Sequence, residues 1–197
     1  MRVGAYPGTF NPPTVAHLAI AEAAWRQGGL DRVELVVSRS PLGKDPIVPS
    51  FEDRLRVLDA VAASRPWLGV TTTDERLIAD VAAGYDAVVM GADKWLQVCD
   101  PAWYGGSQTA RDAAVAHLPR VLLVERPGSE LVPPGPDRGL RLIVDQGHAH
   151  VSSSQARAGR RDWMAPEAAA FDDATGAWTQ PHRYLATTAG DDSGHQT

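Results

Sequence analysis

Short apolar runs recur along the chain at intervals that leave room for a helix between them. They occupy residues 2–6, 32–37, 68–72, 86–90, 120–125 and 140–145. Several of these runs are uninterrupted by charge, as expected for strands that are buried on both faces of a sheet. The segments between them carry apolar residues at helical spacing, most clearly over 14–29, 50–64 and 107–118. Strands that alternate with helices in this way predict a parallel α/β sheet with right-handed crossovers.

End signals support two of these predicted helices. The first stops at Gly28 and Gly29, which is typical of a helix C-terminus. The second opens with Ser50 and has Asp53 three residues later, close to a capping box. Its predicted core face carries Leu55, Leu58, Val61 and Ala62.

The sequence predicts one main domain and a polar tail. With 197 residues, of which 44% are hydrophobic, the chain can bury a substantial single core. Residues 126–139 are rich in turn formers and predict a surface loop. From residue 172 the sequence becomes polar with weak periodicity. We therefore expect a folded domain over residues 1–171 and a flexible C-terminal tail over residues 172–197.

Composition narrows the classes of partner. The formal net charge of −5 and the predicted pI of about 5.6 argue against a non-specific nucleic-acid or membrane-surface binder. The single cysteine, Cys99, excludes an intrachain disulfide framework and fits a reducing compartment. No apolar run approaches the roughly 18 residues of a membrane span, and the N-terminus lacks a signal-peptide pattern. We expect a cytoplasmic protein with no membrane or nucleic-acid partner.

The hinge between the first strand and the first helix, "YPGTFNPPTVAHL", combines residues suited to an anion site. Gly8 permits close backbone approach, and Thr14 and His17 lie one turn apart at a helix N-terminus, whose partial positive charge favours phosphate. The alternative is that Thr14 only caps the helix and His17 only packs against the core. The pattern by itself names no reaction.

The segment "GTFNPPTVAHL" resembles the signature loop of the nucleotidyltransferase superfamily, the α/β-phosphodiesterases. This resemblance implies a Rossmann-like, mostly parallel sheet of five to six strands with helices on both faces. It also implies nucleotidyl transfer from a nucleoside triphosphate to a phosphorylated acceptor, with release of pyrophosphate. Thr14 stands at the first histidine position of the signature, and Ala16 replaces a frequent glycine. By resemblance, Gly8, Thr9, Phe10 and His17 would bind the nucleotide.

Two further segments are similar to the same superfamily. "HVSSSQARAG" resembles a phosphate-binding helix start, which would place Ser152, Ser153, Ser154 and Arg157 at the β- and γ-phosphates. A solvated serine loop is the alternative reading of that segment. "VVMGADKWL" resembles the nicotinate- and nicotinamide-nucleotide adenylyltransferases, in which Gly91 and Asp93 would contact the adenylate. The alternative there is a strand-ending turn with a helix-capping aspartate.

Two tryptophans follow this third segment, in "KWLQVCDPAW". By resemblance, Trp95 or Trp103 would stack on the pyridine of the acceptor, and the alternative for each is a place in the core. The segments "LLVERPG" and "DWMAPEAAAF" are similar to further parts of the bacterial nicotinate enzyme, so the resemblance extends over about residues 1–171.

The implied mechanism is in-line attack of an acceptor phosphate on the α-phosphorus of ATP. Thr14, His17, Lys44 and Arg157 would bind the phosphates, although an exposed loop position is the alternative for Lys44. Mg²⁺ would be carried by the ATP phosphates, since the sequence shows no dedicated carboxylate cage.

The resemblance leaves the acceptor open. The segment "TTTDERLIADVAAGYDAVVM" is short and lacks the Ser-Tyr-x-x-Asp-Thr-like helix that usually precedes the Gly-Ala-Asp strand of the bacterial nicotinate enzyme. The opening loop and the serine run lean towards phosphopantetheine adenylyltransferase, but the Arg-Gly-Leu-Arg segment of that enzyme is missing. The balance favours adenylyl transfer to nicotinate or nicotinamide mononucleotide. A phosphopantetheine enzyme, another nucleotidyltransferase and a nucleotide-binding protein without turnover stay as alternatives, and a homo-oligomer is compatible with the sequence.

Overall fold

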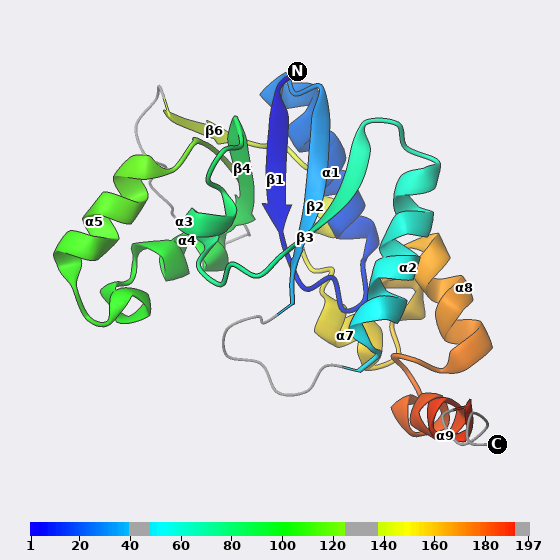
Figure 1. Cartoon of the computed structure of the whole chain (residues 1–197). Coiled ribbons are helices and arrows are strands. Elements are labelled where there is room, and N and C mark those ends of the chain that lie inside the picture. Colours follow the sequence, from blue (N-terminus) through cyan, green and yellow to red (C-terminus); the bar gives the residue numbers. More distant parts are fainter. Residues whose placement is uncertain (40–47, 125–137, 192–197) are drawn as a thin grey trace.

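The central feature of the computed structural model is a parallel β-sheet whose two halves run outward from its middle strands (Figure 1). The structure describes residues 1–39, 48–124 and 138–191, and the side chains only as far as residue 187. Within these residues the sheet has six strands in the order β3-β2-β1-β4-β5-β6, and every pairing is parallel. This confirms the predicted Rossmann-like architecture and places a topological switch point between β1 and β4.

The elements alternate as the apolar pattern predicts. The strands are β1 (Val3–Pro7), β2 (Arg32–Ser38), β3 (Leu68–Thr73), β4 (Ala87–Gly91), β5 (Arg120–Val124) and β6 (Gly139–Arg141). The α-helices are α1 (Val15–Gly28), α2 (Phe51–Ala63), α3 (Ile78–Val81), α4 (Ala92–Cys99), α5 (Gln108–His117), α7 (Ser153–Arg157), α8 (Pro166–Thr175) and α9 (Pro181–Asp191). Short 3₁₀ helices are η1 (Pro101–Tyr104), η2 (Gln146–His148) and η3 (Arg161–Trp163).

Alternate residues of the central strands bury against helices on opposite faces of the sheet. Leu35 and Val89 belong to the larger core cluster, which α1, α2 and α8 cover. Val88 and Met90 belong to the second cluster, to which α4 contributes Trp95 and Val98. Strands buried on both faces require apolar side chains at successive positions, which explains the uninterrupted apolar runs in the sequence.

The start of α2 forms part of the predicted capping box. The Ser50 hydroxyl accepts the N–H of Asp53 at 3.1 Å, as expected for an N-cap. The reciprocal contact is replaced by one from α9, because the N–H of Ser50 donates to the Tyr184 hydroxyl at 3.0 Å and that hydroxyl donates to Oδ2 of Asp53. The chain's C-terminal region therefore holds the start of α2.

The structure differs from the sequence expectation over the start of the predicted tail. Asp172, Trp178 and Tyr184 are buried, with exposed fractions of 2%, 3% and 5%. The carboxylate of Asp172 accepts the N–H groups of Trp178 and Thr179 and the Thr179 hydroxyl, which satisfies it inside the fold. Asp172 and Thr179 therefore owe their place to internal hydrogen bonds, whereas Asp173 and residues 181–183 of the same segment are exposed.

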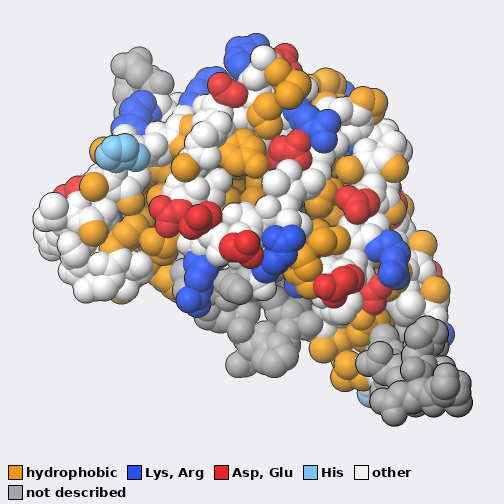
Figure 2. Space-filling model, in the orientation of Figure 1, with side chains coloured by type: hydrophobic (Ala, Val, Ile, Leu, Met, Phe, Trp, Pro, Cys, Tyr) orange, Lys and Arg blue, Asp and Glu red, His pale blue; other side chains and the backbone are white. Residues whose placement is uncertain are grey.

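Acidic and basic side chains are interspersed over the face of the molecule in Figure 2, with apolar side chains between them. Among the described residues, no helix has the length and apolar character that a membrane span requires.

Candidate active site

A cavity of about 510 Å³ opens at the switch point, where the carboxyl ends of β1 and β4 meet the start of α1. Its wall includes ten of the predicted site residues, drawn from three separate segments of the chain. They are Gly8, Thr9, Phe10, Thr14, His17, Gly91, Asp93, Ser152, Ser153 and Ser154. Ligands of open parallel sheets bind at this position because two neighbouring loops diverge there.

A reciprocal cap fixes His17 in the first turn of α1. The Thr14 hydroxyl accepts the N–H of His17 at 3.3 Å, and the N–H of Thr14 donates to Nδ1 of His17 at 3.0 Å. The same hydroxyl lies 2.8 Å from Nδ1. Because Nδ1 accepts a backbone hydrogen bond, the proton of the neutral ring is on Nε2, which makes Nε2 a donor. The structure thus combines both readings of Thr14 and His17, as cap and as cavity wall.

Aromatic contacts complete the surroundings of His17. The Phe10 ring meets it edge-on with centroids 5.1 Å apart, and the Tyr6 ring lies 6.2 Å away. Phe10 is 1% exposed and has a φ of 44°, a left-handed conformation that is rare for a bulky residue. A Cβ on Gly8 would lie 2.7 Å from the Phe10 ring, so this ring requires the glycine. The N–H of Gly8 donates to the Val36 carbonyl and is not available to an anion.

The loop between β1 and α1 is held through its backbone carbonyls. The Ser153 hydroxyl donates to the Pro12 carbonyl at 2.8 Å, and the N–H of Ala165 donates to the Pro13 carbonyl at 2.9 Å. The Arg157 guanidinium donates to the Asn11 carbonyl. Segments more than 140 residues away in sequence therefore set the shape of this loop, since the Arg157 and Ser153 contacts join positions 146 and 141 residues apart.

Arg54 is a buried cation beneath the same loop, and sequence reasoning missed it. It is 3% exposed, donates to the Thr9 carbonyl at 3.1 Å and lies over the Phe51 ring. Burial lowers the pKa of its guanidinium, although the nearby Glu52 acts in the opposite direction. Its spacing from Leu58 and Val61 places it on the buried face of α2, and this helical spacing was the signal in the sequence.

The serine segment supplies side chains rather than a strong helix dipole, because α7 is only five residues long. The Ser152 hydroxyl caps α7 by accepting the N–H of Gln155, and the Ser153 hydroxyl donates to the loop. The Ser154 hydroxyl accepts from Arg157, which leaves its own O–H to donate. Arg157 is exposed and does not line the cavity.

The tryptophans predicted to hold the acceptor differ in position. Trp95 is 6% exposed, lies in the core with Val98 and Met90, and does not line the cavity. Trp103 is 37% exposed and lines a small neighbouring cavity together with Tyr104. Lys44 lies outside the residues that the structure describes.

Comparison with known proteins agrees with this geometry. Residues 5–159 match the sequence model of a family described as cytidylyltransferase-like. The chain belongs to the cytidylyltransferase-like family. This confirms the predicted membership of the nucleotidyltransferase superfamily.

Individual relatives of this cytidylyltransferase-like protein carry more specific names. A probable nicotinate-nucleotide adenylyltransferase of Bordetella pertussis is 30% identical over 135 residues, which cover 68% of each chain. Another of Anaeromyxobacter dehalogenans strain 2CP-C is 34% identical over 147 residues, which cover 66% of this chain and 73% of the relative.

A solved structure of similar fold is the nicotinic acid mononucleotide adenylyltransferase of Plasmodium falciparum complexed with NaAD. It has a TM-score of 0.65 and 12% identity, and the match covers 90% of this chain and 97% of that one. At this identity the likeness concerns the fold.

Proposed function

We propose that the protein transfers the adenylyl group of ATP to the phosphate of a pyridine mononucleotide, with nicotinate mononucleotide as acceptor, and releases pyrophosphate. The observation that carries this proposal is the Thr14–His17 pair at the N-terminus of α1, inside a cavity at the switch point of the sheet. The names of the bacterial relatives support the acceptor.

The reaction needs no covalent enzyme intermediate, because the acceptor phosphate is itself a nucleophile. The protein has to hold two anions together in line and stabilise charge on the α-phosphate and on the leaving pyrophosphate. His17 donates from Nε2 to an α-phosphate oxygen, and the N–H groups of Val15 and Ala16 at the start of α1 add to this. Ser154, in the cavity wall, and Arg157, which donates to the Ser154 hydroxyl, bind the β- and γ-phosphates.

Thr14 has a positioning part in this scheme. Its side chain is 1% exposed and its oxygen is already engaged with His17, so it orients the histidine instead of binding a phosphate itself. This assignment differs from the direct phosphate contact that the resemblance implies.

Asp93 is the one carboxylate in the wall of the cavity among the described residues. Within the same residues, no group of three or more His, Cys, Asp or Glu side chains is arranged to hold a metal ion. A magnesium ion carried by the ATP phosphates, the form in which sequence reasoning predicts it, would need no such group and would have Asp93 within the cavity as an available ligand. When bound there, the ion would neutralise phosphate charge.

Pyrophosphate release from ATP and Mg²⁺ tests the proposal. The acceptors are nicotinate mononucleotide, nicotinamide mononucleotide and phosphopantetheine, each with the wild type, His17→Ala and the control His117→Ala. His117 is an exposed residue near the end of α5. We expect release with nicotinate mononucleotide that His17→Ala lowers by about 10²–10³-fold and that the control preserves.

Two results would contradict the proposal. Release with phosphopantetheine alone would assign a different acceptor to the same fold. No release with any acceptor, while ATP still binds, would indicate a nucleotide-binding protein without turnover.

A further inference from the structure

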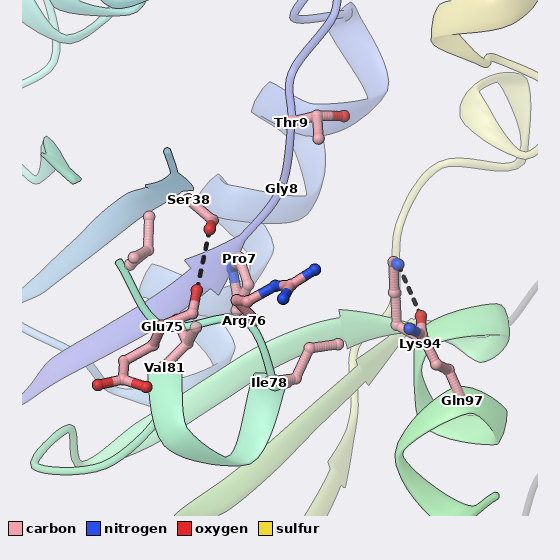
Figure 3. Close-up of a pocket in the computed structure, with 11 residues that line it drawn as sticks. Pro7, Gly8, Thr9, Ser38, Glu75, Arg76, Ile78, Val81, Lys94 and Gln97 are labelled. Atoms are coloured by element: carbon pink, nitrogen blue, oxygen red, sulfur yellow. Dashed lines mark hydrogen bonds between the residues drawn. The ribbon is translucent and has the colours of Figure 1, made fainter. Parts of the chain in front are cut away.

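A second cavity of about 110 Å³ adjoins the His17 cavity, on the side of β2 and of the connection between β3 and α3 (Figure 3). The two share Pro7 at the end of β1, the loop residues Gly8 and Thr9, and Lys94. An acceptor in the second cavity can therefore reach a nucleotide in the first only past Lys94 and this loop.

Arg76 lines the second cavity from the connection between β3 and α3. Among the residues that the structure describes, the Arg76 guanidinium has no hydrogen-bond or ion-pair partner. Figure 3 shows the Arg76 guanidinium and the Glu75 carboxylate pointing to opposite sides. The backbone beside it is fixed, because the Ser38 hydroxyl donates to the Glu75 carbonyl at 2.9 Å. Arg76 is thus a cation at the wall of a cavity, with no anionic partner among the described residues.

Lys94 is the cation at the opposite wall, in the first turn of α4. Its ammonium donates to Oε1 of Gln97 at 2.7 Å, a contact that orients it at the junction (Figure 3). Partial burial lowers the pKa of the Lys94 ammonium, although the Asp93 carboxylate acts in the opposite direction. Partial desolvation also strengthens the attraction of this cation for an anion.

The two cations have different neighbours. Lys94 belongs to both larger cavities, whereas Arg76 is absent from the wall of the His17 cavity and lines a third, small cavity together with Trp103. The phosphate of an acceptor must lie at the junction with the nucleotide, so it lies at the Lys94 end. Its base then extends towards Arg76 and Trp103.

We propose that Arg76 and Lys94 make the second cavity a site for an acceptor with two anionic groups, in which Lys94 binds the phosphate and Arg76 binds a carboxylate on the base. This inference rests on the proposed function and assigns a residue to the choice of nicotinate over nicotinamide mononucleotide. An arginine binds a carboxylate through two parallel charged hydrogen bonds. A neutral carboxamide offers one carbonyl acceptor and no charge.

The test compares the two mononucleotides as acceptors, with kcat/KM at saturating ATP and with binding by calorimetry. The variants are Arg76→Gln, Arg76→Lys and Lys94→Gln. Arg26→Gln is the matched control, since Arg26 is an exposed arginine in the last turn of α1.

We expect Arg76→Gln to lower kcat/KM for nicotinate mononucleotide by about 10- to 100-fold, the worth of a charged hydrogen bond, and to leave the nicotinamide value nearly unchanged. Arg76→Lys should retain part of the preference, because it keeps the charge. Lys94→Gln should lower both values in the same proportion and leave their ratio unchanged, and the control should alter neither.

An unchanged ratio of the two acceptors in Arg76→Gln, in turnover and in binding, would overturn the inference while the proposed function stands. If the wild type turns over neither mononucleotide, the proposed function is wrong, and calorimetry alone then tests whether Arg76 binds the carboxylate. A preference for binding nicotinate mononucleotide that disappears in Arg76→Gln would then support the site, and equal binding of both would refute it.

Discussion

Replacing Thr14 by valine separates two roles that the sequence leaves open for this residue. The Thr14 side chain is 1% exposed, and its oxygen lies 3.3 Å from the N–H of His17 and 2.8 Å from Nδ1 of the ring. Valine has nearly the same shape and fills the same buried space, but it has no hydroxyl. The change therefore removes the cap without leaving a cavity.

The expected losses of stability and of activity follow from the contacts that remain in Thr14→Val. An N-cap side chain is worth about 1 kcal/mol, and a stability change of that size shifts the melting temperature of a domain of about this length by roughly 2–4 °C. The N–H of Thr14 still donates to Nδ1 of His17, so the ring keeps its proton on Nε2. We therefore expect a drop of about 2–4 °C in Tm and a kcat reduced by less than about tenfold.

Thermal unfolding and steady-state pyrophosphate release measure the two effects on the same preparation. Thr14→Ser is the control, because it restores the hydroxyl and should return both values close to those of the wild type. A Thr14→Val enzyme with an unchanged Tm and a kcat lowered by more than about a hundredfold would refute the reasoning, since the hydroxyl would then act on the phosphate.

Three further changes test the surroundings of the site. Arg54→Met removes a buried cation whose Nε has no partner among the described residues, so we expect little change in Tm. The Thr9 carbonyl loses its donor in this variant, so we expect a KM for ATP that is several-fold higher. Trp178→Phe removes the 2.6 Å hydrogen bond from the indole to Asn11, and should cost about 1–3 kcal/mol in urea unfolding and lower kcat, whereas unchanged stability would contradict this contact. Burial lowers the pKa of Lys94 below 10.5 in the free protein, and a bound phosphate raises it again. Acceptor binding at alkaline pH should therefore take up protons and become weaker as the pH rises. Calorimetry in two buffers of different ionisation enthalpy measures this proton uptake, and Lys94→Arg should abolish it.

The parts of the site that sequence reasoning predicted best depend on local geometry. Thr14 and His17 are three residues apart at a helix start, and a reciprocal contact at that spacing follows from helix geometry alone. The strands could be predicted equally well, because a parallel sheet covered on both faces requires apolar residues at successive positions.

The two tryptophans show that helical spacing, and not motif resemblance, predicts whether a side chain lies in the core. Trp95 shares a helical face with Ala92 and Val98, which are three residues away on either side and are buried as well. That spacing indicates a core position. Trp103 follows the end of α4 in a 3₁₀ turn, so no helical face commits it to the core.

Contacts between distant segments could not be predicted from the sequence. Asn11 accepts a hydrogen bond from the Trp178 indole at its Oδ1 and one from the Arg157 guanidinium at its backbone carbonyl. These donors lie 167 and 146 residues away in sequence. No local pattern marks such a partner, and the polar composition after residue 172 indicated solvation. A buried carboxylate that accepts several hydrogen bonds from its own segment has the same sequence signature as an exposed one.

The acceptor side of the proposed site was the hardest to predict, and the structure gives a physical reason. The nucleotide side is built on the ends of β1 and β4, where strand geometry fixes the loop that follows each strand. The acceptor side depends instead on a connection that no strand pairing fixes, from the end of β3 to the four-residue helix α3. No feature of the sequence distinguishes a cation such as Arg76 from any other exposed charged residue. Only its position opposite Lys94, without a partner among the described residues, distinguishes it from the solvated arginines elsewhere on the surface.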